Sequence, residues 1–207
     1  MTEQGTQAWF DARRGKITAS MFAVATSTTR GGSPTEAARQ YAIRVAADRL
    51  GWGSGPRGSS KEMQHGTETE PRARLFYIEQ MPASLSIEMV GFLLHPGHPE
   101  FGGSPDALLG EDGGLEIKSP YHVHRHWSHL CEIEQGRVPD EYKAQVQGLL
   151  WITGRKWWDF MSFMEAGGEK DAVGIVRVER DEDYINTLAC QLLDFNDLVV
   201  KEMERRA

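Results

Sequence analysis

The chain has 207 residues, of which 40% are hydrophobic and 26% are charged, and this predicts one domain over residues 1–207 with a hydrophobic core. The formal net charge of −7 argues against a protein that coats nucleic acid nonspecifically, because phosphate contacts need Lys and Arg. It does not exclude an enzyme that acts on DNA, because binding depends on a local patch and metal-holding carboxylates add negative charge.

The first quarter of the chain predicts a helix between two loops. Residues 26–34 are rich in Ser, Thr and Gly, and residues 51–60 are rich in Gly, Ser and Pro. These compositions are typical of surface loops. Apolar residues recur at helical spacing over residues 35–50, which predicts an amphipathic helix.

A second helix is predicted within residues 66–79. Pro71 lies inside this range, and proline is well tolerated only in the first turn of a helix. The helix is therefore expected to start near Thr69 or Glu70.

The middle of the chain predicts short strands over residues 86–94, 100–109 and 115–118. Residues 110–114 (GEDGG) are typical of a hairpin connection, with the turn at Gly113 and Gly114. This turn is expected to fold the last strand back beside the one that precedes it.

The last third predicts a helix over residues 139–153, strands over 156–165 and 172–180, and a long C-terminal helix that starts at Asp181. Mixed strands flanked by helices indicate an α/β or α+β domain.

The expected chemistry centres on Asp106, Glu116 and Lys118. Side chains alternate along a strand, so Glu116 and Lys118 point the same way while Ile117 points into the core. The hairpin would bring this strand beside Asp106, and the Ile117 carbonyl would be available at the strand edge. Two carboxylates and an ammonium would then converge.

Such a set suits a metal-dependent attack on a phosphate. Carboxylate oxygens are the ligands that Mg²⁺ prefers, and a bound metal activates water and stabilises charge on the phosphate. Lys118 could orient the attacking water. Surface charge on a hairpin is the alternative interpretation.

The spacing of Pro105-Asp106 and Glu116-Ile117-Lys118 is the PD-(D/E)xK pattern. It resembles that of the restriction-endonuclease-like nucleases. This resemblance implies an α/β fold with a central mixed β-sheet flanked by helices.

Four further motifs resemble, in order, those of the lambda exonuclease (YqaJ-type viral recombinase) family. They are residues 9–20 (WFDARRGKITAS), 66–70 (GTETE), 144–147 (AQVQ) with Trp151, and 178–182 (VERDE). The resemblance implies a Mg²⁺-dependent exonuclease, with Mn²⁺ as a substitute, that degrades one strand of linear double-stranded DNA from the 5′ end. It also implies a 3′ overhang, a homotrimeric ring and a single-strand annealing protein as partner in phage-type recombination.

The resemblance also implies roles for individual residues. Glu70 would add an acidic group to the metal site formed by Asp106, Glu116 and the Ile117 carbonyl, and Gln145 would lie near Lys118. Residues that would bind the terminal 5′-phosphate are Arg13, Ser20 and Ser104. A basic phosphate ligand expected soon after the catalytic strand matches either His124 or Arg125, and the sequence leaves this open.

The region from His122 to His129 carries four histidines, with Cys131 nearby. Imidazole and thiolate are good zinc ligands, but no paired ligand motif accompanies them. A DNA-contacting loop is the favoured interpretation, and a solvated loop without a role is the alternative.

Two other functions remain open at this point. An endonuclease or junction resolvase would use the same catalytic residues, and a DNA-end binding scaffold would use the fold without turnover. No apolar run approaches the roughly 20 residues that a membrane span needs, and no signal peptide is evident. With its two unpaired cysteines, the protein is expected in the cytoplasm of a bacterial host cell.

Overall fold

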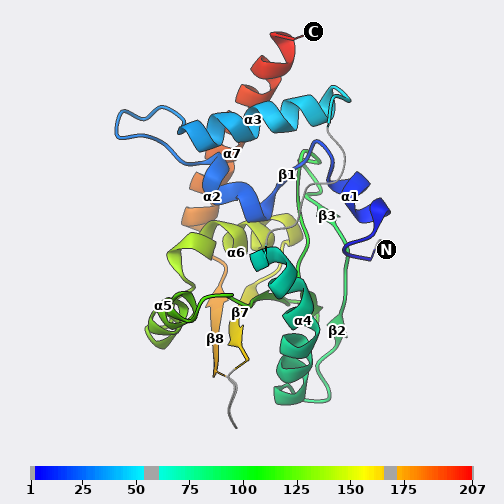
Figure 1. The fold of residues 1–207 in the computed structure, drawn as a ribbon, viewed down its shortest axis with the longest axis vertical. Helices are drawn as coiled ribbons and strands as arrows, with labels where there is room; N and C mark the ends of the chain where they lie inside the picture. The colour runs from blue at the N-terminus through cyan, green and yellow to red at the C-terminus, as the bar shows by residue number, and fades with distance from the viewer. Residues whose placement is uncertain (1–2, 54–60, 166–171, 207) are drawn as a thin grey trace.

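The computed structural model describes residues 3–53, 61–165 and 172–206, in which helices surround two β-sheets (Figure 1). The larger sheet has the order β2-β5-β6-β7-β8 and the smaller one β1-β4-β3. Strands β6 and β7 are parallel, and the other neighbours in the larger sheet are antiparallel. The mixed sheet flanked by helices confirms the predicted fold class.

The strands of the larger sheet are β2 (Ile87–Glu88), β5 (Ala107–Leu109), β6 (Gly113–Lys118), β7 (Trp157–Met164) and β8 (Ala172–Glu179). Those of the smaller sheet are β1 (Ile17–Thr18), β3 (Leu93–Leu94) and β4 (Phe101–Gly103). The helices are α1 (Gln7–Arg13), the short 3₁₀ turn η1 (Ala19–Met21), α2 (Phe22–Ala25), α3 (Glu36–Arg49), α4 (Lys61–Gln80), α5 (Val123–Glu134), α6 (Asp140–Thr153) and α7 (Glu182–Glu204).

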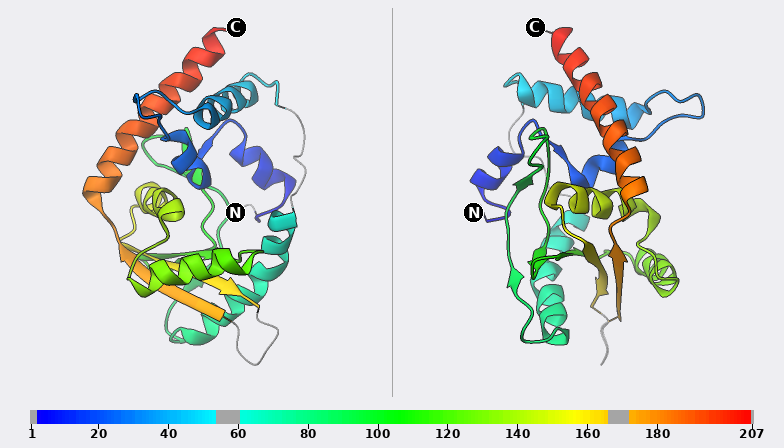
Figure 2. Two further views of the ribbon diagram at one scale, coloured as in Figure 1. Left: turned by 60° about the vertical axis from the view of Figure 1, so that its left-hand side comes forward. Right: turned by 180° about the vertical axis from the view of Figure 1, so that it is seen from behind.

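Helix α4 and helix α5 cover opposite faces of the larger sheet (Figure 2). On one face, Tyr77 of α4 packs in a core cluster with Leu115 and Ile117 of β6. On the other, histidines of α5 reach Ser162 of β7. Side chains alternate between the two faces of a strand, so β6 has an apolar side toward α4 and a polar side toward α5 and α6.

Several helices begin where the sequence indicates a cap. The Thr35 side chain accepts a hydrogen bond from the Ala38 amide at the start of α3. The Asp181 side chain accepts one from the Tyr184 amide at the start of α7. Such caps satisfy backbone donors that have no partner within the helix. The predicted helices at 35–50, 139–153 and the C-terminus are confirmed, as are the two long strands.

The predicted start of the second helix is wrong. Helix α4 begins at Lys61, so Pro71 lies in its interior. Proline removes one backbone hydrogen bond there. The helix continues because its second half is held by packing, with Ala73 and Tyr77 fully buried against the larger sheet.

Two predicted strands are each divided between the two sheets. Residues 86–94 form β2 and β3, and residues 100–109 form β4 and β5. Between β4 and β5, the chain passes from the smaller sheet to the larger one through Ser104-Pro105-Asp106. Strand periodicity alone does not show this crossing, since both halves alternate in the same way.

The hairpin is confirmed, but its turn lies at residues 110–112. Gly110 has a φ of +54° and takes the left-handed conformation of the turn. Gly113 and Gly114 belong to β6, where a side chain would collide with the rings of Trp157 and Trp158. These two glycines are therefore needed for close packing within the sheet and do not form the turn.

The loop predicted around His122–His129 is also wrong, because residues from Val123 onward form α5. The loop at residues 26–34 is confirmed, and most of the one at 51–60 lies outside the described residues. Within the described parts of the chain, no helix combines the length and apolar character that a bilayer crossing requires.

Candidate active site

The hairpin of β5 and β6 brings Asp106, Glu116 and Lys118 together, as the sequence predicts. The Ile117 amide donates a hydrogen bond to Oδ2 of Asp106 at 2.6 Å. Lys118 Nζ donates to Oε1 of Glu116 at 2.6 Å. Strand β6 therefore connects all three groups. It carries Glu116 and Lys118, and the Ile117 amide between them binds the Asp106 carboxylate.

This cluster is buried and electrostatically strained. Asp106 is 8% exposed and Glu116 is 3% exposed. Burial, together with the negative charges of Glu116 and Glu70, raises the pKa of Asp106 well above its ordinary value. Burial by itself would lower the pKa of Lys118, but the charges of Glu116 and Asp106 outweigh it and raise this pKa. The cluster therefore favours the charged form of Lys118 and disfavours the ionised form of Asp106.

Two further predicted residues approach from helices on opposite sides of the sheet. Gln145 of α6 donates through Nε2 to Oε1 of Glu116 at 2.5 Å. Glu70 of α4 pairs with Arg74 one turn later. Burial raises the pKa of Glu70; Arg74 opposes this, and the nearby Glu116 charge adds to it. Glu70 thus shares the electrostatic environment of the cluster.

The donor set suits a hard divalent cation. Oε1 of Glu116 accepts from both Lys118 and Gln145, whereas Oε2 is buried without a hydrogen-bond partner among the described residues. No three His, Cys, Asp or Glu side chains in that part of the chain are arranged to enclose an ion. Mg²⁺ commonly needs only one or two carboxylates, because waters complete its shell. Asp106 and Glu116 therefore fit Mg²⁺ better than a metal that requires a full protein cage.

The Ile117 carbonyl is available as a further ligand, but not because β6 is an edge strand, as the sequence predicted. Strand β6 lies inside the sheet, between β5 and β7. Its pairing with β5 reaches only to Ala107↔Leu115. The Ile117 amide faces Asp106, and the amide and carbonyl of one strand residue point to the same side. The carbonyl is therefore directed toward Asp106, where β5 no longer pairs.

The three predicted phosphate ligands line one cavity of 140 Å³. Its lining consists of Gln4, Trp9, Arg13, Thr18, Ala19, Ser20, Gly103, Ser104 and Gln145. Arg13 donates through a guanidinium nitrogen to Oγ of Ser104 at 3.1 Å. A guanidinium and hydroxyls suit a phosphate group. Because Gln145 also contacts Glu116, this cavity adjoins the carboxylate cluster.

Sequence reasoning assigned no role to Trp9 or Gln4. The Trp9 indole donates to Oγ of Ser104 at 2.9 Å and lies 4.2 Å from the Arg13 guanidinium. Gln4 donates to the carbonyl of Pro105 at 2.9 Å. Trp9 belongs to the motif at residues 9–20, so its proximity to Arg13 was a usable signal. No sequence signal identifies Gln4, since its contact depends on how the N-terminal segment folds back.

The basic candidates after β6, His124 and Arg125, lie on α5 and are not among the residues that line the cavity. Arg125 is exposed and pairs with Glu141 of α6. His124 is exposed, with its ring stacked 5.4 Å from that of His122. His126 and His129 turn inward instead, and each forms a 2.9 Å hydrogen bond with Oγ of Ser162. The four imidazoles therefore do not converge as the zinc alternative requires.

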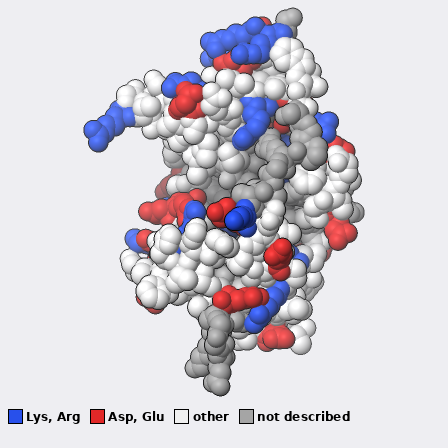
Figure 3. Space-filling view, viewed as in Figure 1, with Lys and Arg blue, Asp and Glu red and all other residues white. Residues whose placement is uncertain are grey.

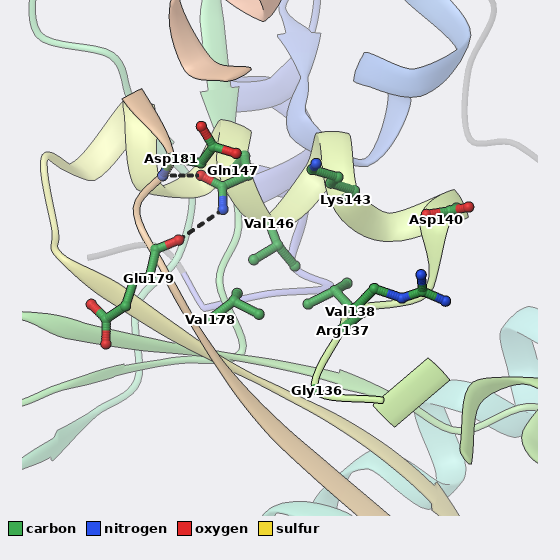
Figure 4. A pocket seen from close by; sticks show the side chains of 10 residues that line it. All are labelled: Gly136, Arg137, Val138, Asp140, Lys143, Val146, Gln147, Val178, Glu179 and Asp181. Carbon is green, nitrogen blue, oxygen red and sulfur yellow. Dashed lines mark hydrogen bonds between the residues drawn. The ribbon is translucent and has the colours of Figure 1, made fainter. Parts of the chain in front are cut away.

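A larger cavity of 240 Å³ lies between the start of α6 and the junction of β8 with α7 (Figure 4). There the Gln147 side chain donates to the Glu179 carbonyl at 3.0 Å and accepts from the Asp181 amide at 3.0 Å. Of the two glutamines in the 144–147 motif, Gln147 joins α6 to β8, and Gln145 reaches the acidic cluster.

Comparison with known proteins identifies relatives over most of the chain. The family model of the YqaJ-like viral recombinase domain matches residues 8–156. The alkaline exonuclease LHK-Exo from Laribacter hongkongensis is 33% identical, with a TM-score of 0.81 over 97% of this chain and 95% of that one. The structure of LHK-Exo in complex with dAMP is 32% identical, with a TM-score of 0.82 over 97% of this chain and 95% of that one.

A phage related exonuclease from Haemophilus somnus 129PT has a TM-score of 0.72 over 93% of this chain and 96% of that one. Its identity is 14%, so the likeness is one of fold. A search among curated proteins found no match. The range matched by the family model includes all the predicted site residues from Arg13 to Gln145.

Proposed function

The chain belongs to the family of YqaJ-like viral recombinase domains, and we propose that it is a nuclease that acts on DNA. The observation that carries this proposal is the cluster of Asp106, Glu116 and Lys118 beside a cavity lined by Arg13 and Ser104. An acidic cluster with a cation is suited to phosphodiester hydrolysis, and the adjoining cavity is suited to a phosphate at a strand end.

The finer proposal is a 5′→3′ exonuclease that degrades one strand of linear double-stranded DNA and leaves a 3′ overhang. A terminal 5′-phosphate held by Arg13, Ser20 and Ser104 would lie next to Gln145, and the adjoining phosphodiester would lie toward Glu116. Binding of a strand end would thus select the bond to be cut. This geometry supports an end-dependent enzyme over an endonuclease.

Mg²⁺, with Mn²⁺ as a substitute, is the proposed cofactor. Asp106, Glu116 and the Ile117 carbonyl would hold it, and Glu70 would support it from α4. The ion would activate water and neutralise charge that develops on the phosphate.

The chain's own residues position the reacting groups. Lys118, held by Glu116 at 2.6 Å, would orient the attacking water and stabilise negative charge on the phosphate oxygens. Gln145 donates to the same Glu116 oxygen. Both contacts reduce the freedom of Glu116, so the carboxylate is oriented before DNA binds.

A homotrimeric ring and a single-strand annealing partner complete the proposal. On the face shown in Figure 3, basic side chains are interspersed with acidic ones, and one basic group gathers where α7 ends. A closed ring around DNA would keep an acidic protein on its substrate without a strong, salt-sensitive affinity. Sedimentation that gives a stable monomer at working concentration would contradict the ring.

The test is digestion of a 5′-phosphorylated linear duplex with Mg²⁺, beside the same DNA as a closed circle. We expect mononucleotides from the 5′ ends and an intact circle. Cutting of the circle would show an endonuclease with the same catalytic residues. No release of nucleotides with Mg²⁺ or Mn²⁺ would favour a DNA-end binding scaffold.

A further inference from the structure

A buried chain of polar side chains crosses the interface between α5 and the larger sheet. His126, His129 and Ser162 are each no more than 1% exposed. Oγ of Ser162 lies 2.9 Å from Nδ1 of both histidines. Nε2 of His129 lies 3.1 Å from Oε1 of Glu141 on α6. The Glu141 carboxylate then pairs with the exposed Arg125 through Oε2.

Tight packing at Gly174 brings α5 within reach of Ser162. Gly174 pairs with Ser162 across β7 and β8. A Cβ at Gly174 would lie 2.6 Å from Leu130 and 3.0 Å from Ile133 of α5. A larger residue would therefore displace these side chains and disturb the packing of α5 against the sheet.

The hydrogen bonds define the proton positions along this chain. An ionised Glu141 only accepts hydrogen bonds, so His129 carries its proton on Nε2. Neutral His129 then accepts at Nδ1 from the Ser162 hydroxyl, and that oxygen accepts from Nδ1–H of His126. Nε2 of His126 is left as a bare lone pair, and it has no hydrogen-bond partner among the described residues. The three hydrogen bonds therefore form with both imidazoles neutral.

His129 also supports a residue beside the acidic cluster. Its ring lies edge-on to that of Tyr142, with centroids 5.3 Å apart. The centroid of the Tyr142 ring also lies 5.0 Å from Lys118 Nζ. Arg125 also interacts with Tyr142. One buried histidine thus contacts both Glu141, which holds Arg125, and Tyr142, which lies against Lys118.

We propose that the His126–Ser162–His129 chain is a positioning device that holds the Arg125 guanidinium, through Glu141, at the DNA backbone next to Lys118. Without the donor at Nε2 of His129, Glu141 would lose its link to the buried histidines. The Arg125 guanidinium, which is more than half exposed, would then be held in place only by its interaction with Tyr142. The role in DNA binding rests on the proposed function.

Two substitutions at one position separate this role from simple packing. In His129→Gln the terminal amide replaces Nε2 and still donates to Glu141. In His129→Asn the shorter amide replaces Nδ1 and reaches only Ser162. We expect His129→Gln to keep the Kd for a 5′-phosphorylated duplex within about threefold of the wild-type value. We expect His129→Asn to raise this Kd about tenfold and to reduce the salt dependence of binding by about one phosphate contact. Equal effects of both variants would indicate packing alone.

A double-mutant cycle with Arg125→Ala, measured as DNA binding in EDTA, tests the connection. We expect His129→Asn to add nothing once Arg125 is removed, so the double variant matches Arg125→Ala. Glu132→Gln, another α5 residue paired with an arginine, is the control and should add independently. Additive effects for His129→Asn would overturn the proposal. Binding without cleavage by the wild type would refute the nuclease and leave this cycle readable.

Imidazole ¹⁵N NMR tests the hydrogen bonds among His126, Ser162 and His129 in the absence of DNA. We expect neutral His129 with its proton on Nε2 and neutral His126 with its proton on Nδ1. In Ser162→Ala we expect loss of the His126 signature, whereas His129 keeps its proton on Nε2 because Glu141 still accepts it. A His129 proton on Nδ1 alone would overturn the proposal, whatever the protein does to DNA.

Discussion

Lys118 Nζ donates a 2.6 Å hydrogen bond to Oε1 of Glu116, two residues earlier on the same strand. The Glu116 side chain is only 4% exposed, and that of Lys118 is 24% exposed. A strand places alternate residues on one side, so this pairing needs no help from distant segments. It fixes the cation where a phosphate would meet the carboxylates.

Replacement of Lys118 by Ala should abolish cleavage. We expect at least about a thousandfold loss of kcat with little change in the Kd for DNA, because the contact acts on charge in the transition state. Lys156→Ala is the control, since that lysine is exposed and pairs with Asp112 on the same hairpin. Undiminished cleavage by Lys118→Ala would refute the assigned role.

Replacement of Arg13 by Ala should remove the preference for phosphorylated ends. Arg13 contacts Ser104 within the cavity, whereas neighbouring Arg14 pairs with Asp11 at the surface. We expect KM for 5′-phosphate ends to rise about tenfold or more, toward that for 5′-hydroxyl ends. Arg14→Ala should retain the preference. Retained discrimination in Arg13→Ala would place the phosphate elsewhere.

Replacement of Asp106 by Asn should stabilise the metal-free protein. The pKa of Asp106 is raised by burial and by Glu116 and Glu70, so its ionised form destabilises the fold as pH rises above the ordinary value of 3.8. We expect a gain of about 1 kcal/mol or more in EDTA at pH 7, measured by denaturant unfolding. Asp112→Asn, at an exposed ion pair, should be near neutral. A loss in Asp106→Asn would contradict this account.

Acid should destabilise the protein through its buried histidines. Burial lowers the pKa of His126, and the nearby His129 adds to this; burial also lowers the pKa of His129. The unfolded chain binds protons below the ordinary value of 6.5, whereas the folded one stays neutral, so the free energy of unfolding falls as pH drops through this value. Each histidine contributes up to about 1.4 kcal/mol per pH unit.

Urea unfolding between pH 8 and 5 measures this slope. His126→Gln should reduce it, and His124→Gln, at an exposed position, should leave it unchanged. An identical slope in His126→Gln would mean that this imidazole binds protons equally in the folded and unfolded chain, so that burial does not lower its pKa.

Two helical glycines should respond oppositely to Ala. A Cβ at Gly148 of α6 would collide with the buried Phe22 ring, whereas one at Gly66 of α4 would meet open space. Gly148→Ala should cost about 1–3 kcal/mol by overpacking. Gly66→Ala should stabilise by up to about 1 kcal/mol, because alanine favours helix. A tolerated Gly148→Ala would mean that α6 shifts freely, and Gln145 would then lose its fixed contact with Glu116.

The sequence by itself determined the centre of the site. Asp106, Glu116 and Lys118 lie on one hairpin, so their convergence follows from strand alternation and a short connection. The long strands and three of the helices follow from periodicity and caps. These features depend on neighbours along the chain, which one sequence displays directly.

Only the tertiary structure decided which distant groups join that centre. Gln145 comes from α6 and Glu70 from α4, and Trp9 of α1 lines the cavity beside Arg13. The histidines of α5 turn onto Ser162 because Gly174 lets the helix approach the sheet. Residues far apart in the chain meet only when packing fixes the angle and depth of each helix, and those quantities depend on all the side chains in the interface at once.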